Sequence, residues 1–218
     1  KPETETAFVA LMDFAKNTRN ENNLFQKGFV DAITRQVTDK EPVPFKENII
    51  NPGTIIFATD YDLGRSGISY HDADSADYWV STSTRVNWNE GGQYRNDGVD
   101  IQPCHDDVTN GYNIGWIKDG EWMQYRVYSG SDATYDINFR TAVEAGNASL
   151  ELFTNNAIQN KSLLLTSTGS YQHWQTNTIK AVRLSKGWNN LKVLAVKGGF
   201  NLNYLQFISP ANTAMKSD

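Results

Sequence analysis

The chain has 218 residues, of which 39% are hydrophobic and 12% aromatic, and a formal net charge of −5 spread along its length. Such a chain can bury one sizeable core, so we expect one domain with a smaller appendage rather than two full domains. The charge excludes the basic field that nucleic acid or an anionic membrane surface would require, and no apolar run approaches the roughly 20 residues of a membrane-spanning helix.

The first 41 residues are predicted to form a short helical hairpin. Apolar residues recur there at the spacing of amphipathic helices, first at Phe8, Leu11, Met12 and Ala15, and then at Phe25, Phe29, Ile33 and Val37. Two such short helices cannot bury both apolar stripes alone, so we expect them to pack on the following domain or on a neighbouring one. Residues 42–53 follow as a proline-rich linker, which predicts a domain boundary.

From Thr54 onward the apolar pattern has a period of two, which is typical of β-strands. Alternating segments such as EWMQYRVY, TYDINFRTAV, ASLELF, NLKVLAV and NLNYLQFI are separated by turn sequences such as SGSDA, EAGN and SKGWNN. Many short strands without intervening helices predict an all-β domain, a two-sheet jelly-roll β-sandwich, over residues 54–210. Residues 211–218 then form a C-terminal tail.

A long polar segment between Gly64 and Asp97 interrupts this alternation. It contains three tyrosines and two tryptophans, which argue against disorder. A loop of this length in a compact domain is usually either functional or disordered. We therefore expect this inserted segment to be ordered and to serve the function of the domain.

The sequence contains no catalytic motif. None of the three histidines has another at the i, i+4 spacing of a helical zinc site, and there is no nucleophile elbow, phosphate-binding loop or dinucleotide-binding glycine motif. Asp119 and Glu121 bracket an Asp-Gly turn, and we interpret them as parts of a solvated turn rather than as an acid–base pair. We predict no catalytic residue, because a free-standing hydrolase would rest only on such unpaired carboxylates.

Three loop positions carry aromatic rings or amides. Trp116 precedes the turn in GYNIGWIKDGEW, Tyr171 lies at the tip of a loop in TSTGSYQHW, and Asn201 begins the strand in GGFNLN. Taken singly, an aromatic residue in a loop more often packs beneath that loop. Together they suit a pyranose ring, because aromatic faces can cover its C–H faces while amides donate and accept hydrogen bonds at its hydroxyl groups.

At these residues the sequence resembles a known family. The segments GYNIGWIKDGEWMQYRV, TYDINFRTAV, TGSYQHWQT, KGWNNLKVL and GGFNLNYLQFI are similar to those of family 6 carbohydrate-binding modules, which are galactose-binding-like β-sandwiches appended to polysaccharide-degrading enzymes. The upstream segments YDLGRSGISYHD and GGQYRNDGVDIQP resemble elongated variants attached to glycoside hydrolases of Bacteroidetes. The resemblance covers about residues 54–209.

The resemblance implies a sugar-binding cleft among the loops at one edge of the sandwich. Members of the family hold the sugar between two aromatic residues, which fall here on Trp116 and Tyr171, and use an asparagine at the start of the last strand, which falls on Asn201. A polar residue upstream of these falls on Gln102. By extrapolation within the inserted segment, we expect Tyr94 to form a further wall of the cleft.

The resemblance also implies a structural calcium, which family members generally hold through a first-strand EAE motif and an aspartate in the last strand. The matching positions here are Phe57, Thr59 and Asn203, so two or three negative oxygen ligands are missing. A divalent ion that leaves water needs anionic or many carbonyl ligands in return. The sequence therefore predicts no certain cofactor and leaves a calcium ion at this site open.

These observations predict a non-catalytic module that binds a neutral polysaccharide or its chain ends and is linked to a glycoside hydrolase within one parent protein. The resemblance implies a bacterial protein located outside the cell, at its surface or in the periplasm. The alternative is a structural sandwich that braces an upstream catalytic domain, with its sugar cleft closed by the inserted segment.

Overall fold

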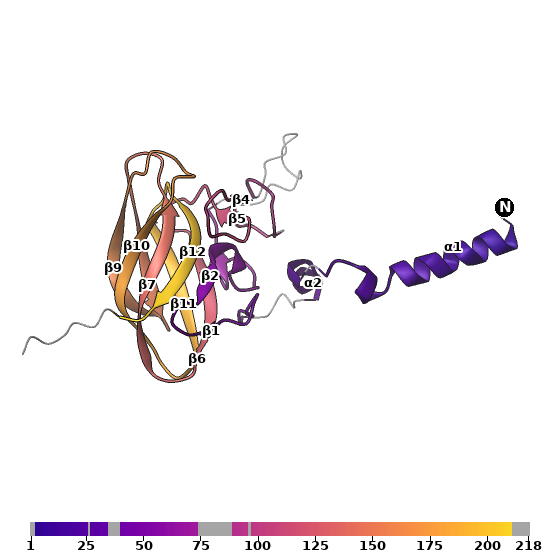
Figure 1. The fold of residues 1–218 in the computed structure, drawn as a ribbon, viewed down its shortest axis with the longest axis horizontal. Helices are drawn as coiled ribbons and strands as arrows, with labels where there is room; N and C mark the ends of the chain where they lie inside the picture. The colour runs from indigo at the N-terminus through magenta and orange to yellow at the C-terminus, as the bar shows by residue number, and fades with distance from the viewer. Residues whose placement is uncertain (1–2, 26, 35–39, 74–88, 96, 211–218) are drawn as a thin grey trace, which may run out of the picture.

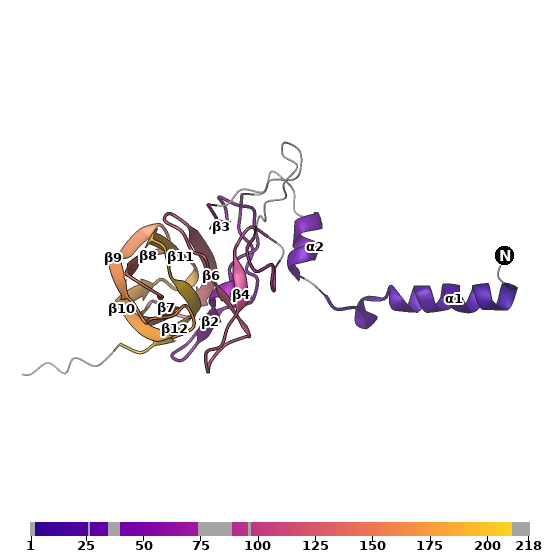
Figure 2. The ribbon, with the colours of Figure 1, turned by 90° about the horizontal axis from the view of Figure 1, so that it is seen from above.

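The computed structural model describes residues 3–25, 27–34, 40–73, 89–95 and 97–210 (Figure 1). Its main body is a two-sheet β-sandwich, which confirms the predicted mostly β architecture. Seen from above, the two sheets face each other and enclose the core, and the helices lie to one side of them (Figure 2). Neither described helix is long and apolar enough to cross a membrane.

The first sheet has the strand order β1-β6-β11-β8-β9, with β3 also paired to β6. Its strands are β1 (Ile49–Ile50), β3 (Tyr70–His71), β6 (Trp122–Ser129), β8 (Asn147–Thr154), β9 (Ala157–Thr166) and β11 (Gly187–Lys197). Of the strand pairs in the described ranges, β1–β6 is parallel and the others are antiparallel.

The second sheet has the strand order β10-β7-β12-β5-β4, with β2 also paired to β12. Its strands are β2 (Ile55–Phe57), β4 (Ile101–Pro103), β5 (Tyr112–Ile114), β7 (Ala133–Ala142), β10 (Gln175–Leu184) and β12 (Asn201–Ile208). A short 3-10 helix, η2 (Ala58–Asp60), follows β2 directly. The last strand, β12, therefore lies in the middle of its sheet, between β7 and β5.

Strand β6 shows how the period-two pattern produces the core. Burial alternates along the strand, and its side chains Met123, Tyr125 and Val127 are buried between the sheets. The Tyr125 hydroxyl donates to the main-chain oxygen of Ala58 at 2.9 Å, so its one polar atom is satisfied inside the core. On the facing sheet Phe207 is fully buried as well, so apolar side chains from both sheets fill the interior.

The predicted helical hairpin is wrong. The structure has two helices in this region, α1 (Thr4–Asn17) and α2 (Lys27–Thr34), with the 3-10 turn η1 (Asn20–Asn22) between them. Both views show α1 extending away from α2 and from the sandwich (Figures 1 and 2), and its residues are exposed. The amides of Asn22 and Asn23 donate to the oxygens of Lys16 and Asn17, so the asparagine-rich segment caps α1 instead of folding the chain back.

The segment predicted as a linker is bound to the sandwich. Val43 and Leu63 exchange two main-chain hydrogen bonds, at 2.9 and 2.7 Å, and β1 adds residues 49–50 to the first sheet. The Lys27 ammonium group on α2 donates to the carbonyl oxygens of Pro44 and Phe45. The proline-rich stretch thus connects α2 to the β-domain through direct contacts.

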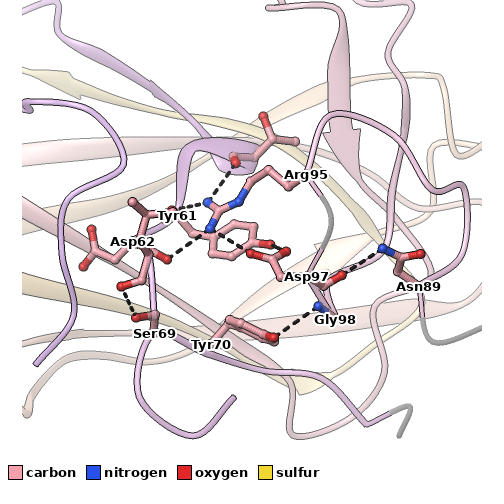
Figure 3. Close-up of polar contacts among 10 residues, drawn as sticks. Tyr61, Asp62, Ser69, Tyr70, Asn89, Arg95, Asp97 and Gly98 are labelled. Carbon is pink, nitrogen blue, oxygen red and sulfur yellow. Dashed lines mark hydrogen bonds and ion pairs between the residues drawn. The ribbon is translucent and has the colours of Figure 1, made fainter. Parts of the chain in front are cut away.

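Arg95 fastens the described end of the inserted segment to the sandwich (Figure 3). Its buried guanidinium donates to the main-chain oxygens of Tyr61 and Asp62, and to the Asp97 carboxylate at 2.8 Å. The guanidinium carbon lies 3.6 Å from the ring centroid of Tyr61 and 4.7 Å from that of Phe45. Charge, carbonyl dipoles and aromatic faces together compensate the desolvation of the cation.

Asp97 connects this cluster to Asn89, where the described part of the inserted segment begins again. Its carboxylate accepts a hydrogen bond from the Tyr61 hydroxyl, and its main-chain oxygen accepts one from the Asn89 amide at 2.8 Å (Figure 3). The neighbouring Gly98 N–H donates to the Tyr70 hydroxyl at 3.1 Å. The described end of the inserted segment is therefore held against the sandwich, and residues 74–88, for which order was also expected, lie outside the described residues.

Candidate ligand-binding cleft

A cleft opens among the loops at one edge of the sandwich, with a volume of about 280 Å³. Its lining residues come from β4, from the loop after β5, from the loop between β9 and β10, and from the loop before β12 and the first residue of that strand: Gln102, Trp116, Ile117, Tyr171, Gln172, Gly199, Phe200 and Asn201. The volume lies just below the range of about 300–1,000 Å³ that is usual for pockets of drug-sized ligands. The cleft therefore suits a small ligand.

Trp116 forms one wall of the cleft in a strained conformation. Its φ angle is 49°, a left-handed value that a bulky side chain rarely adopts, and its side chain is 45% exposed. Such strain costs about 1–3 kcal/mol and persists where the surrounding structure enforces it. The preceding Gly115 is held by its N–H, which donates to the main-chain oxygen of Asp100 at 3.1 Å. The loop thus holds an exposed indole at the cleft at a cost in the free energy of folding.

Gly115 lets the cleft amides approach the loop closely. A Cβ atom at this position would lie 2.9 Å from the Gln102 Nε2 atom and 3.2 Å from the Asn201 Oδ1 atom. The first distance is shorter than side-chain carbons tolerate, so a larger residue would push Gln102 out of place. The Gly-Trp sequence therefore combines room for the amides with an exposed ring.

Tyr171 forms the second aromatic wall, and its side chain is 39% exposed. The Asn201 Nδ2 group donates to the main-chain oxygen of Tyr171 at 2.8 Å. The next residue, Gln172, donates through Nε2 to the Pro103 oxygen at 3.2 Å and accepts the His105 N–H at 3.0 Å. Two amide side chains therefore tie this loop to the second sheet.

Sequence reasoning missed Gln172, which both lines the cleft and anchors its loop. The signal in the sequence was an amide residue directly after a loop aromatic residue, as in TGSYQHW. The hydrogen-bond partners of Gln172 in β4 and in the loop after β4 are about 70 positions earlier in the chain, so the sequence did not reveal them. Ile117 and Phe200 also line the cleft, from positions beside two of the predicted site residues.

The polar groups of the cleft are neutral amides. Asn201 is only 1% exposed, and its Oδ1 atom has no hydrogen-bond partner among the described residues. The side chain of Gln102 likewise has no described hydrogen bond. Within the described ranges, no Asp, Glu, Lys, Arg or His side chain lines the cleft. The cleft thus offers amide donors and acceptors without a net charge.

Tyr94, expected as a further wall, lies elsewhere. Its ring packs on Tyr112, with centroids 5.0 Å apart, and on Phe45, and its hydroxyl donates to the Asp60 carboxylate at 2.6 Å. Burial, followed by the hydrogen bond to Asp60, raises the pKa of the Tyr94 hydroxyl. The structure therefore places Tyr94 in the contact between the inserted segment and the sandwich.

The two carboxylates beside the Asp-Gly turn support the backbone. Glu121 is buried and accepts the N–H groups of Lys118 and Ala73, at 3.0 and 3.1 Å, while Asp119 accepts the Gly198 N–H at 2.7 Å. The interpretation as a solvated turn is therefore wrong for Glu121, whose oxygens are used inside the fold. Neither carboxylate lines the cleft.

The positions that match the calcium ligands of the family do not fit a calcium ion. Phe57 packs edge-on against Tyr204, and the Thr59 hydroxyl accepts a hydrogen bond from the Asn110 amide at 3.0 Å. Asn203 turns its Nδ2 group toward two oxygens, Asp106 Oδ2 at 2.9 Å and Val108 O at 2.8 Å. A donor group that faces the nearest oxygens leaves them engaged in hydrogen bonds rather than free for a cation.

Arg140 already neutralises the nearest carboxylate. Its Nε and Nη2 atoms each donate to one oxygen of Asp106, both at 2.8 Å. Burial raises the pKa of the Asp106 carboxyl, but hydrogen bonds from Arg140 and Asn203 outweigh that effect and hold the pKa below its ordinary value. Among the described residues, no three His, Cys, Asp or Glu side chains gather closely enough to hold a metal ion.

Known proteins resemble the chain in the β-domain. The model of the carbohydrate binding module (family 6) matches residues 90–209. The clotting factor G alpha subunit of Tachypleus tridentatus is 31% identical over 102 residues, which are 46% of this chain and only 15% of that protein. The chain thus corresponds to a small part of this curated relative.

Solved structures have the same fold. The module CsCBM6-3 of Clostridium stercorarium, solved with cellobiose, matches with a TM-score of 0.52 at 15% identity, over 75% of this chain and 98% of that module. The module CBM6cm-2 of Cellvibrio mixtus lichenase 5A, solved with cellotriose, is 28% identical over 52% of this chain and 88% of that module, with a TM-score of 0.47. The first of these comparisons supports the sandwich topology described above.

Proposed function

The chain belongs to the family 6 carbohydrate-binding modules, which are non-catalytic, and from this membership we propose that the cleft between Trp116 and Tyr171 binds a neutral polysaccharide or its chain ends. The observation that carries the proposal is the pairing of two exposed aromatic side chains with amides that have unused hydrogen-bonding capacity. A sugar ring would place its C–H faces against the rings and its hydroxyl groups toward Gln102 and Asn201.

A neutral ligand is favoured by the electrostatics of the cleft. A uronic acid or a sulfated sugar would lose water around its charge and find no described cation among the lining residues in return. The amides can instead donate to and accept from hydroxyl groups at no such cost. We therefore propose uncharged glycans as the ligand class.

The affinity is expected to be modest. Two stacked rings and a few hydrogen bonds correspond to a Kd from about micromolar to millimolar, or roughly −8 to −4 kcal/mol. Tethering to an enzyme or to further modules raises the effective affinity without new contacts. We accordingly propose that the module is linked to a glycoside hydrolase, as in the elongated Bacteroidetes variants, and works outside the cell, at its surface or in the periplasm.

The alternative, a structural brace whose cleft is closed by the inserted segment, has less support. The cleft has an appreciable volume, and Tyr94 of the inserted segment packs against Tyr112 outside it, while residues 74–88 of the segment lie outside the described residues. A brace predicts that the chain binds no glycan.

The proposal is tested on a glycan array and on affinity gels. We expect the chain to bind neutral oligosaccharides in preference to their uronic-acid counterparts. Trp116→Ala and Tyr171→Ala should lose retention on a gel that contains the bound polysaccharide, with little change in melting temperature. The matched control is Trp188→Ala, because Trp188 is equally exposed, at 47%, but does not line the cleft. Normal retention of both cleft variants would refute this site.

A further inference from the structure

The described end of the inserted segment lies close to the Trp116 indole, and we infer that its residue Gly91 positions this indole for glycan binding. This inference rests on the proposed function of the cleft. It adds a residue that does not line the cleft to the set that determines binding.

The chain around Gly91 is held in place by hydrogen bonds on its N-terminal side. The Asn89 amide donates to the Asp97 main-chain oxygen at 2.8 Å, as drawn in Figure 3. The Glu90 N–H donates to the Asp100 carboxylate, and the Glu90 oxygen accepts the Ile101 N–H at 3.2 Å. The segment therefore runs beside β4 in a fixed register.

Asp100 ties this segment to the loop that carries the indole. Its carboxylate binds the Glu90 N–H, while its main-chain oxygen accepts the Gly115 N–H at 3.1 Å. Asp100 is buried, at 2% exposure. Asp100 thus binds the residue before Gly91 and the residue before Trp116, and it fixes the two segments relative to each other.

Gly91 approaches Trp116 more closely than any other residue type would allow. Its φ angle is 75°, which favours glycine, and an added Cβ atom would lie 2.1 Å from the Ile101 oxygen and 3.3 Å from Cζ3 of the Trp116 indole. The first distance is impossible without a backbone shift, and the second would press on the ring. Gly91 does not line the cleft, so an effect of this residue on a ligand would act through the indole.

This contact matters because the indole is otherwise exposed. Trp116 has a strained backbone and nearly half of its surface in solvent, so few contacts fix its orientation. Stacking on a sugar depends on the angle and position of the ring. Gly91 is therefore a positioning residue, and the described end of the inserted segment contributes to the binding site without lining the cleft.

The test compares Gly91→Ala with Gly92→Ala. Gly92 also has a positive φ angle, 57°, but a Cβ atom there would meet nothing within 4 Å, so it reproduces the backbone strain without the contact. The chain is labelled with 5-fluorotryptophan, and the ¹⁹F resonance of Trp116 is identified by its loss in Trp116→Phe. We expect Gly91→Ala to shift this resonance and to weaken glycan binding by about three- to tenfold, and Gly92→Ala to do neither.

A second pair of variants keeps the test decisive if Gly91→Ala folds poorly. Asn89→Ala removes the hydrogen bond to Asp97 without adding bulk, and it should also shift the Trp116 resonance. In a Trp116→Phe background, which lacks the atom nearest Gly91, the extra effect of Gly91→Ala on binding should disappear. A Trp116 resonance that stays unmoved in Gly91→Ala and in Asn89→Ala would overturn the inference. Absence of glycan binding by the wild type would instead overturn the proposed function, while the resonance still reports on positioning.

Discussion

The Arg95 cluster and the cleft are two polar regions of one domain that use their hydrogen-bonding groups in opposite ways. In the cluster, the two terminal nitrogens of Arg95 and the carboxylate of Asp97 are bound to each other and to nearby carbonyl and hydroxyl groups, and of the guanidinium nitrogens Nε alone has no described partner. In the cleft, the Asn201 Oδ1 atom and the Gln102 amide have no described partner. Polar groups that are satisfied internally stabilise the fold, and groups left unused at an accessible edge are available to a ligand.

The same contrast occurs within one strand. Asn201 and Asn203 both lie in β12, two residues apart, and both are buried. Asn203 donates through Nδ2 to Asp106 and Val108, and its Oδ1 atom is buried without a described partner, whereas Asn201 donates to the Tyr171 main-chain oxygen and has its Oδ1 atom at the cleft. The two asparagines therefore differ in where the free acceptor lies: that of Asn203 is inside the fold, and that of Asn201 is at the cleft, where a ligand can reach it.

The largest expected effect comes from breaking the cluster. Arg95→Met leaves the Asp97 carboxylate without its cation, and we expect the free energy of unfolding to fall by about 3–5 kcal/mol. The melting temperature should fall by about 10 °C. Arg183→Met is the matched control, because that arginine is exposed and has no described side-chain hydrogen bond or ion pair. Similar unfolding curves for the two variants would contradict a stabilising role for the cluster.

The second effect concerns the pH dependence of the same region. Burial raises the pKa of the Asp62 carboxyl to about 6, from an ordinary value of 3.8, even though the Arg126 N–H donates to it. The folded state therefore holds the proton more tightly than the unfolded state. The contribution of this group to the free energy of unfolding is therefore greatest below about pH 4. It decreases by about 3 kcal/mol as the pH rises from about 4 through 6.

This pH effect is measured by denaturant unfolding of the wild type and Asp62→Asn between pH 4 and 7. The asparagine keeps an oxygen for the Arg126 N–H and cannot ionise, so the variant should become the more stable protein toward pH 7. Parallel pH profiles for the two proteins would assign the titration to another carboxyl group.

A smaller effect on stability distinguishes the cleft from the cluster. Trp116→Gly relieves a left-handed backbone that costs a bulky residue about 1–2 kcal/mol, so this variant should unfold at a melting temperature a few degrees higher. It should also lose glycan binding, because the stacking surface is gone. Thermal unfolding and gel retention measure the two effects separately. A variant that is both less stable and still bound would show that the loop is not strained for binding.

The smallest effect is expected from chelation of divalent metals. The positions that match the calcium ligands hold Phe57, Thr59 and Asn203, and Arg140 already neutralises Asp106. Unfolding in EDTA and in millimolar calcium should therefore give melting temperatures that agree within about 2 °C. A calcium-dependent increase well beyond that would show that Asp106 releases Arg140 to bind the ion.

Much of the sandwich could be predicted from sequence because it depends on local alternation. The spacing alone predicts a strand at residues such as Met123, Tyr125 and Val127. The family resemblance implied one cleft shared by Trp116, Tyr171, Asn201 and Gln102, and the structure brings these four residues to its lining.

The failures have a common physical origin in contacts between distant segments. Tyr94 was expected in the cleft, but its partner Asp60 is 34 positions away and draws it to the sandwich. Glu121 looks like a solvated turn residue until the Ala73 N–H, 48 positions earlier, is found to bind it. The helical spacing of the first segment was real, but spacing does not say whether the amides of Asn22 and Asn23 will cap a helix or turn the chain.

The two ends of the Asn201 amide couple ligand binding to the rigidity of the Tyr171 loop. One end holds the Tyr171 loop through Nδ2, and the other offers Oδ1 to a ligand. When a sugar hydroxyl donates to Oδ1, it polarises the amide and strengthens the bond from Nδ2 to the loop. A bound glycan should therefore stiffen the loop that carries Tyr171. The main-chain amide hydrogens of this loop should then exchange more slowly in the presence of saturating glycan.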